Sequence, residues 1–350
     1  MLCRRLCAGV SHRRMPGLAA AAGVAVLVGY MSVAEAATYT WGGANGTWST
    51  AATNWTGASG TPWSAASGTG NVAAFTTGSI AVTVSEPITT SGITLGQSGV
   101  SIGDGTITLG GAAPAVTVST GVTGTIGSVL AGSAGLTKSG NGTLVLSGSS
   151  TYTGTTAIGS GTLQLAGGAN RIATGGTLSF TGSNTVFDVT NTSQTLSAMT
   201  FLQPTTGTAA ATLAGAGGSV TVNGSANFEV GPGGAIGTSG IANSLSMATL
   251  SSFAYTNPAG AFRVGLKSGA TNTSTAGTSS IVLAQNNAIT ATTLGVADVA
   301  ASNNGGRAQL LLGQTNAFNV TTITQGSNRS DSRMAFQAGL TSPSLVIRGT

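Results

Sequence analysis

Cysteine, histidine and charged residues are scarce in this chain of 350 residues. The two cysteines, Cys3 and Cys7, and the single histidine, His12, all precede residue 37. The first 36 residues are expected to be removed, which would leave neither disulfides nor thiolate or imidazole metal sites. Catalytic mechanisms that pair serine or cysteine with histidine are excluded for the same reason. We therefore expect no metal ion and no cofactor.

Charge is also sparse, since charged side chains make up 5% of the sequence. Four of the 12 basic residues and one of the seven acidic residues precede residue 37, which leaves eight basic and six acidic side chains. These charges are scattered along the chain, so no basic stripe is available to neutralise phosphate groups. Nucleic acid is therefore not an expected partner.

The N-terminal 36 residues have the layout of a secretory signal peptide. A basic leader containing Arg4, Arg5, Arg13 and Arg14 precedes an apolar run over Leu18–Val33. The small residues Ala34 and Ala36 then suit a signal peptidase, so cleavage is expected before Ala37. The apolar run is shorter than the roughly 20 residues that a membrane helix needs, so no stable membrane span is expected in the mature chain. An uncleaved anchor is the alternative.

Hydroxylated and aliphatic residues alternate with a period of two along the rest of the chain, which predicts strands with one buried face. Glycine, asparagine or serine separates the runs, as expected at tight turns or where stacked backbones approach closely. No competing amphipathic helix is visible, so the predicted class is all-β. The runs are Ala81–Val84, Val100–Ile102, Thr106–Leu109, Ala115–Val118, Thr143–Leu146, Thr162–Leu165, Ser219–Val222, Ile281–Leu283 and Gln309–Leu312.

An internal repeat favours a solenoid over a sandwich or barrel. Residues 283–294 align without gaps on residues 312–323, at an offset of 29 residues. Such a period indicates a supersecondary unit that buries its apolar face by stacking on its neighbours. At roughly one coil per 20 to 30 residues, we expect about 10 to 15 coils with a rise of about 4.8 Å each. Threonine and asparagine could then align as ladders between coils.

A longer motif begins at Leu136 and reads LTKSGNGTLVLSGSSTYTG, followed by Thr156, Ile158 and Gly161-Thr162-Leu163. It resembles the autotransporter-associated β-strand repeat, also called the passenger-associated transport repeat. Ser150 departs from the usual asparagine and Thr155 from a common second glycine. The resemblance implies a right-handed parallel β-helix of the passenger type, found in surface and outer-membrane-secreted proteins. It also implies a role for outer-membrane secretion machinery.

The alternation within this motif predicts which of its side chains fill the interior. The inward set is Leu136, Leu144, Leu146, Ile158, Leu163 and Leu165, and the predicted turns lie at Gly140, Gly142, Gly148, Gly154 and Gly161. Lys138 is the one charge between Asp104 and Arg171. We expect Lys138 to be a solvated residue at the edge of the repeat.

All four tryptophans, Trp41, Trp48, Trp55 and Trp63, lie near the start of the predicted mature chain. The segment resembles the N-terminal region that often precedes such repeats. The indoles are predicted to cap the first coil, because a solenoid must shield its apolar end and unpaired strand edge. The alternative is a platform on which glycans stack.

The acidic residues after the leader are Glu86, Asp104, Asp188, Glu229, Asp298 and Asp331. They are well separated and carry no catalytic motif, so no catalytic residue is assigned. Residues 329–333, RSDSR, are expected to form a solvated loop with local ion pairing. The last residues, SLVIRGT from Ser344, are expected to form a strand with a free edge, which suggests a fragment or an incomplete gene.

These observations predict four segments. They are a signal peptide over 1–36, a tryptophan-rich cap with the first coils over 37–135, the repeat over 136–168, and further coils over 169–350. The expected function is that of a secreted or cell-surface structural and adhesive protein without catalytic activity. Its partners would be surface glycans or host and matrix components. A carbohydrate-binding or polysaccharide-active β-helix is the alternative.

Overall fold

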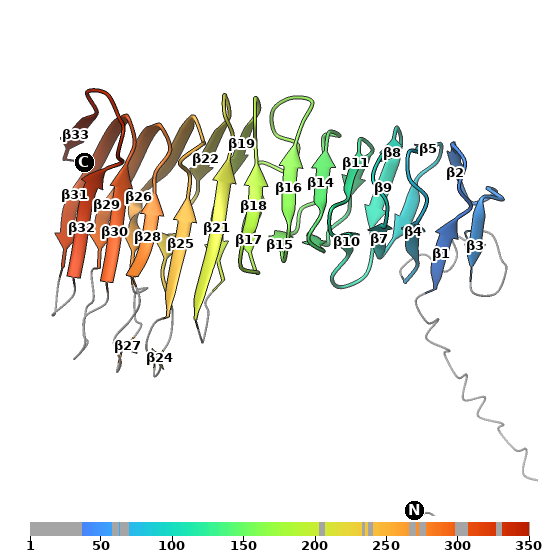
Figure 1. Cartoon of the computed structure of the whole chain (residues 1–350), viewed down its shortest axis with the longest axis horizontal. Helices are drawn as coiled ribbons and strands as arrows, with labels where there is room; N and C mark the ends of the chain where they lie inside the picture. The colour runs from blue at the N-terminus through green and yellow to red at the C-terminus, as the bar shows by residue number, and fades with distance from the viewer. Residues whose placement is uncertain are drawn as a thin grey trace, which may run out of the picture. The chain divides into compact units, whose positions relative to one another are not determined.

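The computed structural model describes residues 37–57, 63, 70–202, 207–232, 235–236, 241–265, 271–272, 278–297, 307–326 and 331–349. The predicted signal peptide lies outside the described residues. Every regular element within them is a β-strand, and the strands stack into parallel sheets (Figure 1). None of the described residues forms a helix of the length and hydropathy needed to cross a bilayer. The predicted all-β solenoid is therefore confirmed.

Two long sheets form most of the wall. The nine-stranded sheet contains β1 (Thr38–Trp41), β3 (Trp55–Gly57), β4 (Val72–Phe75), β7 (Gly92–Leu95), β10 (Ala115–Val118), β13 (Leu136–Ser139), β15 (Thr156–Ile158), β17 (Thr177–Phe180) and β20 (Ala198–Phe201). The 12-stranded sheet contains β2 (Gly46–Trp48), β5 (Ala81–Val84), β8 (Val100–Gly103), β11 (Thr123–Ile126), β14 (Thr143–Leu146), β16 (Thr162–Leu165), β18 (Thr185–Asp188), β21 (Thr208–Ala214), β25 (Ala242–Ser246), β28 (Thr278–Val282), β30 (Arg307–Leu312) and β32 (Asp331–Phe336).

The remaining wall changes along the stack. It begins with a three-stranded sheet of β6 (Ile88–Thr90), β9 (Thr106–Leu109) and β12 (Val129–Ala131). A seven-stranded sheet follows, with β19 (Ser193–Leu196), β22 (Ser219–Asn223), β23 (Phe228–Val230), β26 (Ser252–Val264), β29 (Asn286–Val296), β31 (Thr315–Gln325) and β33 (Ser344–Arg348). A two-stranded sheet pairs β24 (Ala235–Ile236) with β27 (Thr271–Asn272).

The strand registers show that successive coils lie directly on one another. Thr143 of β14 pairs with Thr162 of β16, which is 19 positions later. Asn287 of β29 pairs with Asn316 of β31, which reproduces the 29-residue offset visible in the sequence. Among the described strands, β1 and β3 are the antiparallel pair and all other pairings are parallel. The internal repeat therefore corresponds to one coil of the solenoid.

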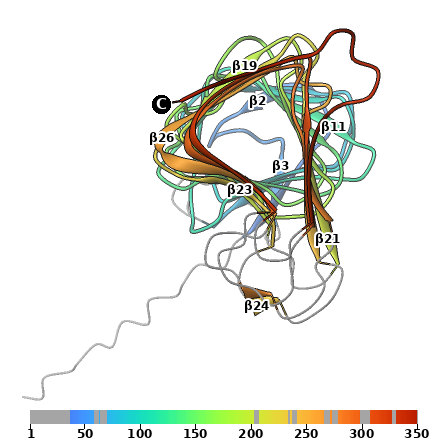
Figure 2. The same cartoon turned by 90° about the vertical axis from the view of Figure 1, so that its left-hand side faces the viewer.

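Viewed along the stack, the strands enclose a central space (Figure 2). Buried apolar side chains fill it. Most of the described strands alternate buried and more exposed positions, as in β14, where Leu144 and Leu146 are buried. Further along, phenylalanines replace the aliphatic residues: Phe180 stacks on Phe201 at 5.4 Å between ring centroids, and Phe228 stacks on Phe262 at 4.7 Å. One continuous apolar interior therefore links coils that are far apart in sequence.

Amide and hydroxyl ladders also connect the coils. Asn287 Nδ2 donates to Asn316 Oδ1 of the next coil at 2.9 Å, and each side chain also bonds the backbone of its own turn. The hydroxyls of Thr117 and Ser139 lie 2.8 Å apart on β10 and β13. The predicted alignment of asparagine and threonine between coils is thus observed, and it satisfies polar groups that burial would otherwise leave unpaired.

Residues near the C-terminal end lie on strands rather than in a loop. The prediction of a loop with local ion pairing was wrong for Asp331 and Arg333, since both belong to β32. Stacking places Asp331 beside Arg307 of β30, with 4.0 Å between Oδ2 and Nε, so the partner comes from the preceding coil. Residues 327–330 lie outside the described residues. The predicted terminal strand is present as β33, which pairs with β31.

Candidate functional site

The repeat motif beginning at Leu136 spans two successive coils of the stack, because β13 pairs with β15 and β14 pairs with β16. Its aliphatic side chains point into the interior, and each is at most 1% exposed: Leu136 from β13, Leu144 and Leu146 from β14, Ile158 from β15, and Leu163 and Leu165 from β16. Tyr152 is also buried, and its hydroxyl lies 2.6 Å from Thr156 Oγ1. The motif therefore supplies interior side chains to two stacked coils.

The glycines of the motif sit where the backbone of the preceding coil passes closest. A Cβ at Gly154 would lie 2.2 Å from the backbone nitrogen of Gly135. At Gly140 the Cβ would lie 2.1 Å from the carbonyl oxygen of Val118, and the φ angle is +72°. The close approach of the coils therefore explains why both positions are glycine. At Gly140 the left-handed backbone conformation is a second reason, because glycine adopts it without steric cost.

Lys138 is buried, so the prediction that it is solvated was wrong. Its ammonium nitrogen lies 3.0 Å from the carbonyl oxygen of Ser139, 2.7 Å from that of Gly140 and 3.0 Å from that of Ser160. These three acceptors match the three protons of an ammonium group. The alternation that places Leu136 inside also places Lys138 inside two residues later, and this signal could have identified it.

The pH dependence of stability tests the environment of Lys138. Burial lowers the pKa of Lys138 to about 8, whereas an unfolded lysine keeps its proton up to about pH 10.4. Between these two pKa values the unfolded chain binds more protons than the folded chain, so the free energy of unfolding rises with pH. From about pH 7.5 to about pH 10 we expect the wild type to gain about 1 to 3 kcal/mol in unfolding free energy relative to Lys138→Met. Urea denaturation at both pH values measures this difference. An equal change in unfolding free energy with pH for the wild type and Lys138→Met would contradict the expectation.

The four tryptophans gather inside the first coils rather than on the surface. Trp41, Trp48, Trp55 and Trp63 are each at most 4% exposed. Trp48 lies 5.1 Å from both Trp55 and Trp63 between ring centroids, and Trp41 meets Trp55 edge to face at 4.9 Å. β3 pairs antiparallel with β1 at the end of its sheet. No indole face is open to solvent in this arrangement, which favours the cap over a glycan platform.

Three of the described carboxylates make structural contacts within the stack. Glu86 Oε1 accepts from the backbone N–H of Thr50, which lowers the pKa of Glu86. Asp188 accepts from Gln164 Nε2 at 3.1 Å and from the hydroxyl of Thr190 at 2.6 Å. Glu229 lies 3.4 Å from Arg263. Within the described part of the chain, no three acidic, histidine or cysteine residues come together as metal ligands would. Asp298 lies outside the described residues.

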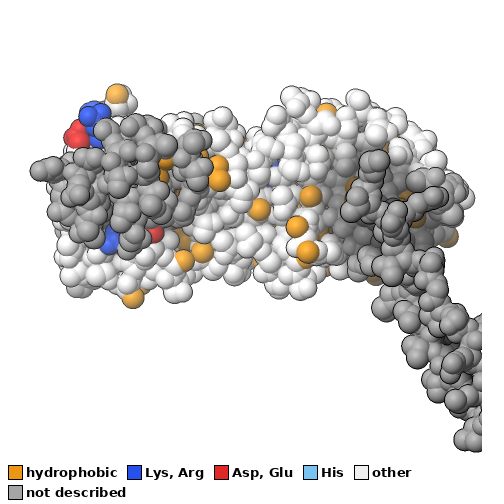
Figure 3. All heavy atoms as spheres, turned by 90° about the horizontal axis from the view of Figure 1, so that it is seen from below, with side chains coloured by type: hydrophobic (Ala, Val, Ile, Leu, Met, Phe, Trp, Pro, Cys, Tyr) orange, Lys and Arg blue, Asp and Glu red, His pale blue; other side chains and the backbone are white. Residues whose placement is uncertain are grey.

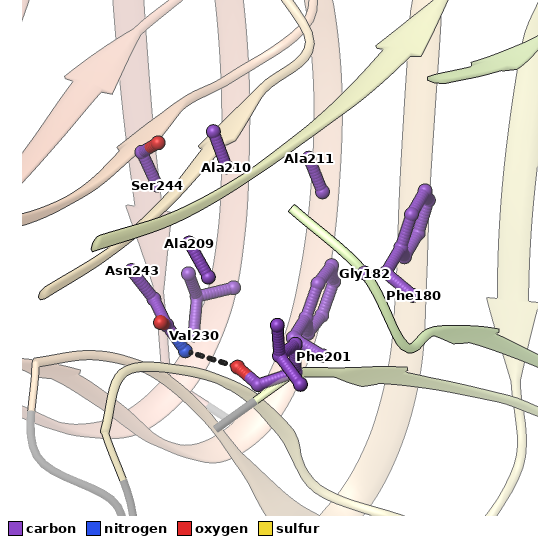
Figure 4. Close-up of a pocket in the computed structure, with 10 residues that line it drawn as sticks. Phe180, Gly182, Phe201, Ala209, Ala210, Ala211, Val230, Asn243 and Ser244 are labelled. Carbon is purple, nitrogen blue, oxygen red and sulfur yellow. Dashed lines mark hydrogen bonds between the residues drawn. The ribbon is translucent and has the colours of Figure 1, made fainter. Parts of the chain in front are cut away.

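A small cavity lies in the interior near the phenylalanine stack (Figure 4). Phe180, Phe201 and Val230 line it together with the amide of Asn243, whose Nδ2 donates to the carbonyl oxygen of Leu202 at 2.8 Å. Asn243 Oδ1 is buried without a protein partner. The cavity volume is about 10 Å³, which is the space of about one water molecule. It is therefore too small for a sugar or any larger ligand.

A larger hollow opens on the wall beside the repeat. It has a volume of about 410 Å³ and is lined by Ser150, Thr153, Asn170, Ile172, Ala173, Thr174, Gly175 and Gly176. These residues come from two loops, one between β14 and β15 and the other between β16 and β17. We refer to this hollow as the loop groove. Sequence reasoning missed it because neither loop carries a periodic or catalytic motif.

Comparison with known proteins connects these two coils to a known repeat. Residues 136–165 match the profile described as the passenger-associated-transport-repeat. The chain carries a passenger-associated transport repeat. This segment coincides with the strands from β13 to β16, so the motif recognised in the sequence covers two stacked coils of the solenoid.

The chain is also similar to a curated surface protein. It is 36% identical over 145 residues to the adhesin BmaC autotransporter of Brucella suis biovar 1 (strain 1330). The aligned region covers 40% of this chain and 4% of that protein. No solved structure matches significantly. The passenger repeat and this relative together assign the chain to the cell surface or the extracellular space. The chain is thus a β-solenoid that carries this repeat, and its alignment spans a small fraction of the relative's length.

Proposed function

We propose that this chain is an adhesive segment of a surface passenger, which holds neutral, hydroxyl-rich surface away from the cell and has no catalytic role. The observation that carries the proposal is the stack of parallel coils around one apolar interior, combined with similarity to an autotransporter adhesin. Its partners would be surface glycans or matrix components. Its export would use outer-membrane secretion machinery, for which the passenger repeat and the relative are the support.

The surface chemistry suits adhesion through many weak polar contacts. Figure 3 shows a face on which charged side chains are few and most of the described surface is neutral. Outward positions on the strands are occupied by hydroxylated residues, such as Thr117, Ser139 and Thr200. Repetition of similar contacts along a rigid stack raises avidity, because each later contact forms at a high effective concentration.

The domain organisation that fits this role keeps the predicted boundaries. The cap and first coils would occupy residues 37–135, the passenger repeat residues 136–168, and further coils residues 169–350. The burial of the four tryptophans beside β1 and β3 supports the assignment of the first segment.

A bead-attachment assay tests the adhesive role. Latex beads coated with the purified chain are expected to remain on epithelial monolayers and on immobilised extracellular matrix under flow, at several times the number retained after coating with heat-unfolded chain. Equal retention of the two coatings would contradict adhesion. Release of reducing ends from a panel of polysaccharides by the same preparation would contradict the absence of catalysis.

A further inference from the structure

The loop groove lies where regular pairing between coils is interrupted on one wall. Before it, residues of the first loop pair with β12 and the residue that follows it: the N–H of Thr151 donates to the carbonyl oxygen of Leu130, and that of Thr153 to the carbonyl oxygen of Gly132. After it, Asn170 joins β19, since its N–H donates to the carbonyl oxygen of Ser193. No strand is assigned between β12 and β19 on this wall, and the 410 Å³ hollow occupies the gap.

The two loops that form the groove are held firmly. The N–H of Ser150 donates to the carbonyl oxygen of Arg171 at 3.0 Å and joins the loops at one end. Gln194 of β19 bonds both backbone groups of Ile172, with distances of 3.2 and 2.9 Å. The hydroxyl of Ser197 donates to the carbonyl oxygens of Gly175 and Gly176. The groove is therefore preformed, which lowers the entropic cost of binding a ligand.

The lining is polar but carries no charge. Ser150 is 7% exposed, and its hydroxyl has no protein hydrogen-bond partner. Thr153, Asn170 and Thr174 add exposed polar side chains, while Ile172 and Ala173 supply apolar contact. The nearby Arg171 guanidinium is occupied elsewhere, because its Nη1 bonds Ser147 O at 3.0 Å and Ser149 Oγ at 2.8 Å.

We propose that the loop groove binds a neutral saccharide of one or two sugar units. This inference deepens the proposed adhesive function and rests on it. Hydroxyl and amide groups match the hydroxyls of a sugar, and the apolar side chains match its C–H faces. A groove of about 410 Å³ falls within the usual range for small-ligand sites. An anionic ligand such as a phosphate or sialic acid would find no cation in the lining.

Gly175 and Gly103 provide a blocking variant and a matched control. A Cβ at either glycine would meet nothing within 4 Å, and neither has a positive φ. Gly175→Val should therefore place a side chain in the groove without strain, whereas Gly103→Val adds the same atoms on β8, away from it. Thermal melts establish that both variants fold.

Saturation-transfer difference NMR tests the groove with methyl glycosides and disaccharides of glucose, galactose, mannose and N-acetylglucosamine. We expect at least one sugar to bind with roughly millimolar affinity, Gly175→Val to abolish the signal, and Gly103→Val to leave it unchanged. The proposal is overturned if no sugar binds, or if Gly175→Val binds like the wild type.

The bead assay separates the two proposals. If folded Gly175→Val loses sugar binding and its beads also detach, the groove carries the adhesion. If no sugar binds the wild type while its beads attach, the saccharide proposal is overturned and adhesion stands. If wild-type beads do not attach, the adhesive function fails whatever the NMR result.

Discussion

Gly140→Ala is expected to lower the free energy of unfolding by about 3 kcal/mol or more. A left-handed backbone costs a non-glycine residue about 1 to 2 kcal/mol, and the φ of Gly140 is +72°. The added Cβ would also lie 2.1 Å from the carbonyl oxygen of Val118, so the two coils must separate. Chemical denaturation measures the loss, and amide hydrogen exchange should show it first in β10 and β13, which the displaced contact joins.

Gly103→Ala is the control for this substitution. Gly103 lies on β8 and has open space around its Cα, so alanine should change stability by no more than about 0.5 kcal/mol. Equal losses for the two variants would mean that the loss reflects a general cost of replacing glycine. If Gly140→Ala lowered the free energy of unfolding only slightly, that result would contradict the close approach of the coils.

Trp48→Ala is expected to cost about 3 to 5 kcal/mol, the usual range for removing a buried large aromatic side chain. Trp48 is 0% exposed and contacts two other indoles and Phe75. Its loss should open the end of the stack, so we also expect concentration-dependent self-association through the exposed edge. Urea denaturation and analytical ultracentrifugation measure the two effects.

Phe336→Ala removes an aromatic side chain from the opposite part of the stack and serves as the comparison. Phe336 is 38% exposed on β32, so its truncation should cost about 1 kcal/mol or less. Similar costs for the two variants would show that the tryptophans do not form a tightly packed cap. A monomeric, fully stable Trp48→Ala would show the same.

Much of the fold follows from two patterns in the sequence. Alternation with a period of two places Leu144 and Leu146 inside, and the 29-residue offset becomes the pairing of Asn287 with Asn316. Both patterns are predictive because parallel coils impose them directly: a strand has two faces, and stacking repeats its environment once per coil.

Other features depend on tertiary contacts that no local pattern reports. Lys138 was expected to be solvated because it carries a charge, yet three carbonyl groups from two turns make its buried position tolerable. The loop groove forms where the coil lengthens, since 19 residues separate paired positions of β14 and β16 but 24 separate those of β16 and β18. The sequence shows the extra residues, but only the folded loops define a hollow.

Engineered disulfides test the stacking of coils most directly, since the sequence contains no cysteine after Cys7. Thr137 pairs with Ala157, and Ala157 pairs with Ser179 one coil further on. Adjacent coils are about 4.8 Å apart, within reach of a disulfide, whereas two coils span about 10 Å. The account predicts rapid cross-linking in the double variant Thr137→Cys with Ala157→Cys and none in Thr137→Cys with Ser179→Cys. Failure of the first pair, or equal cross-linking of both, would contradict it.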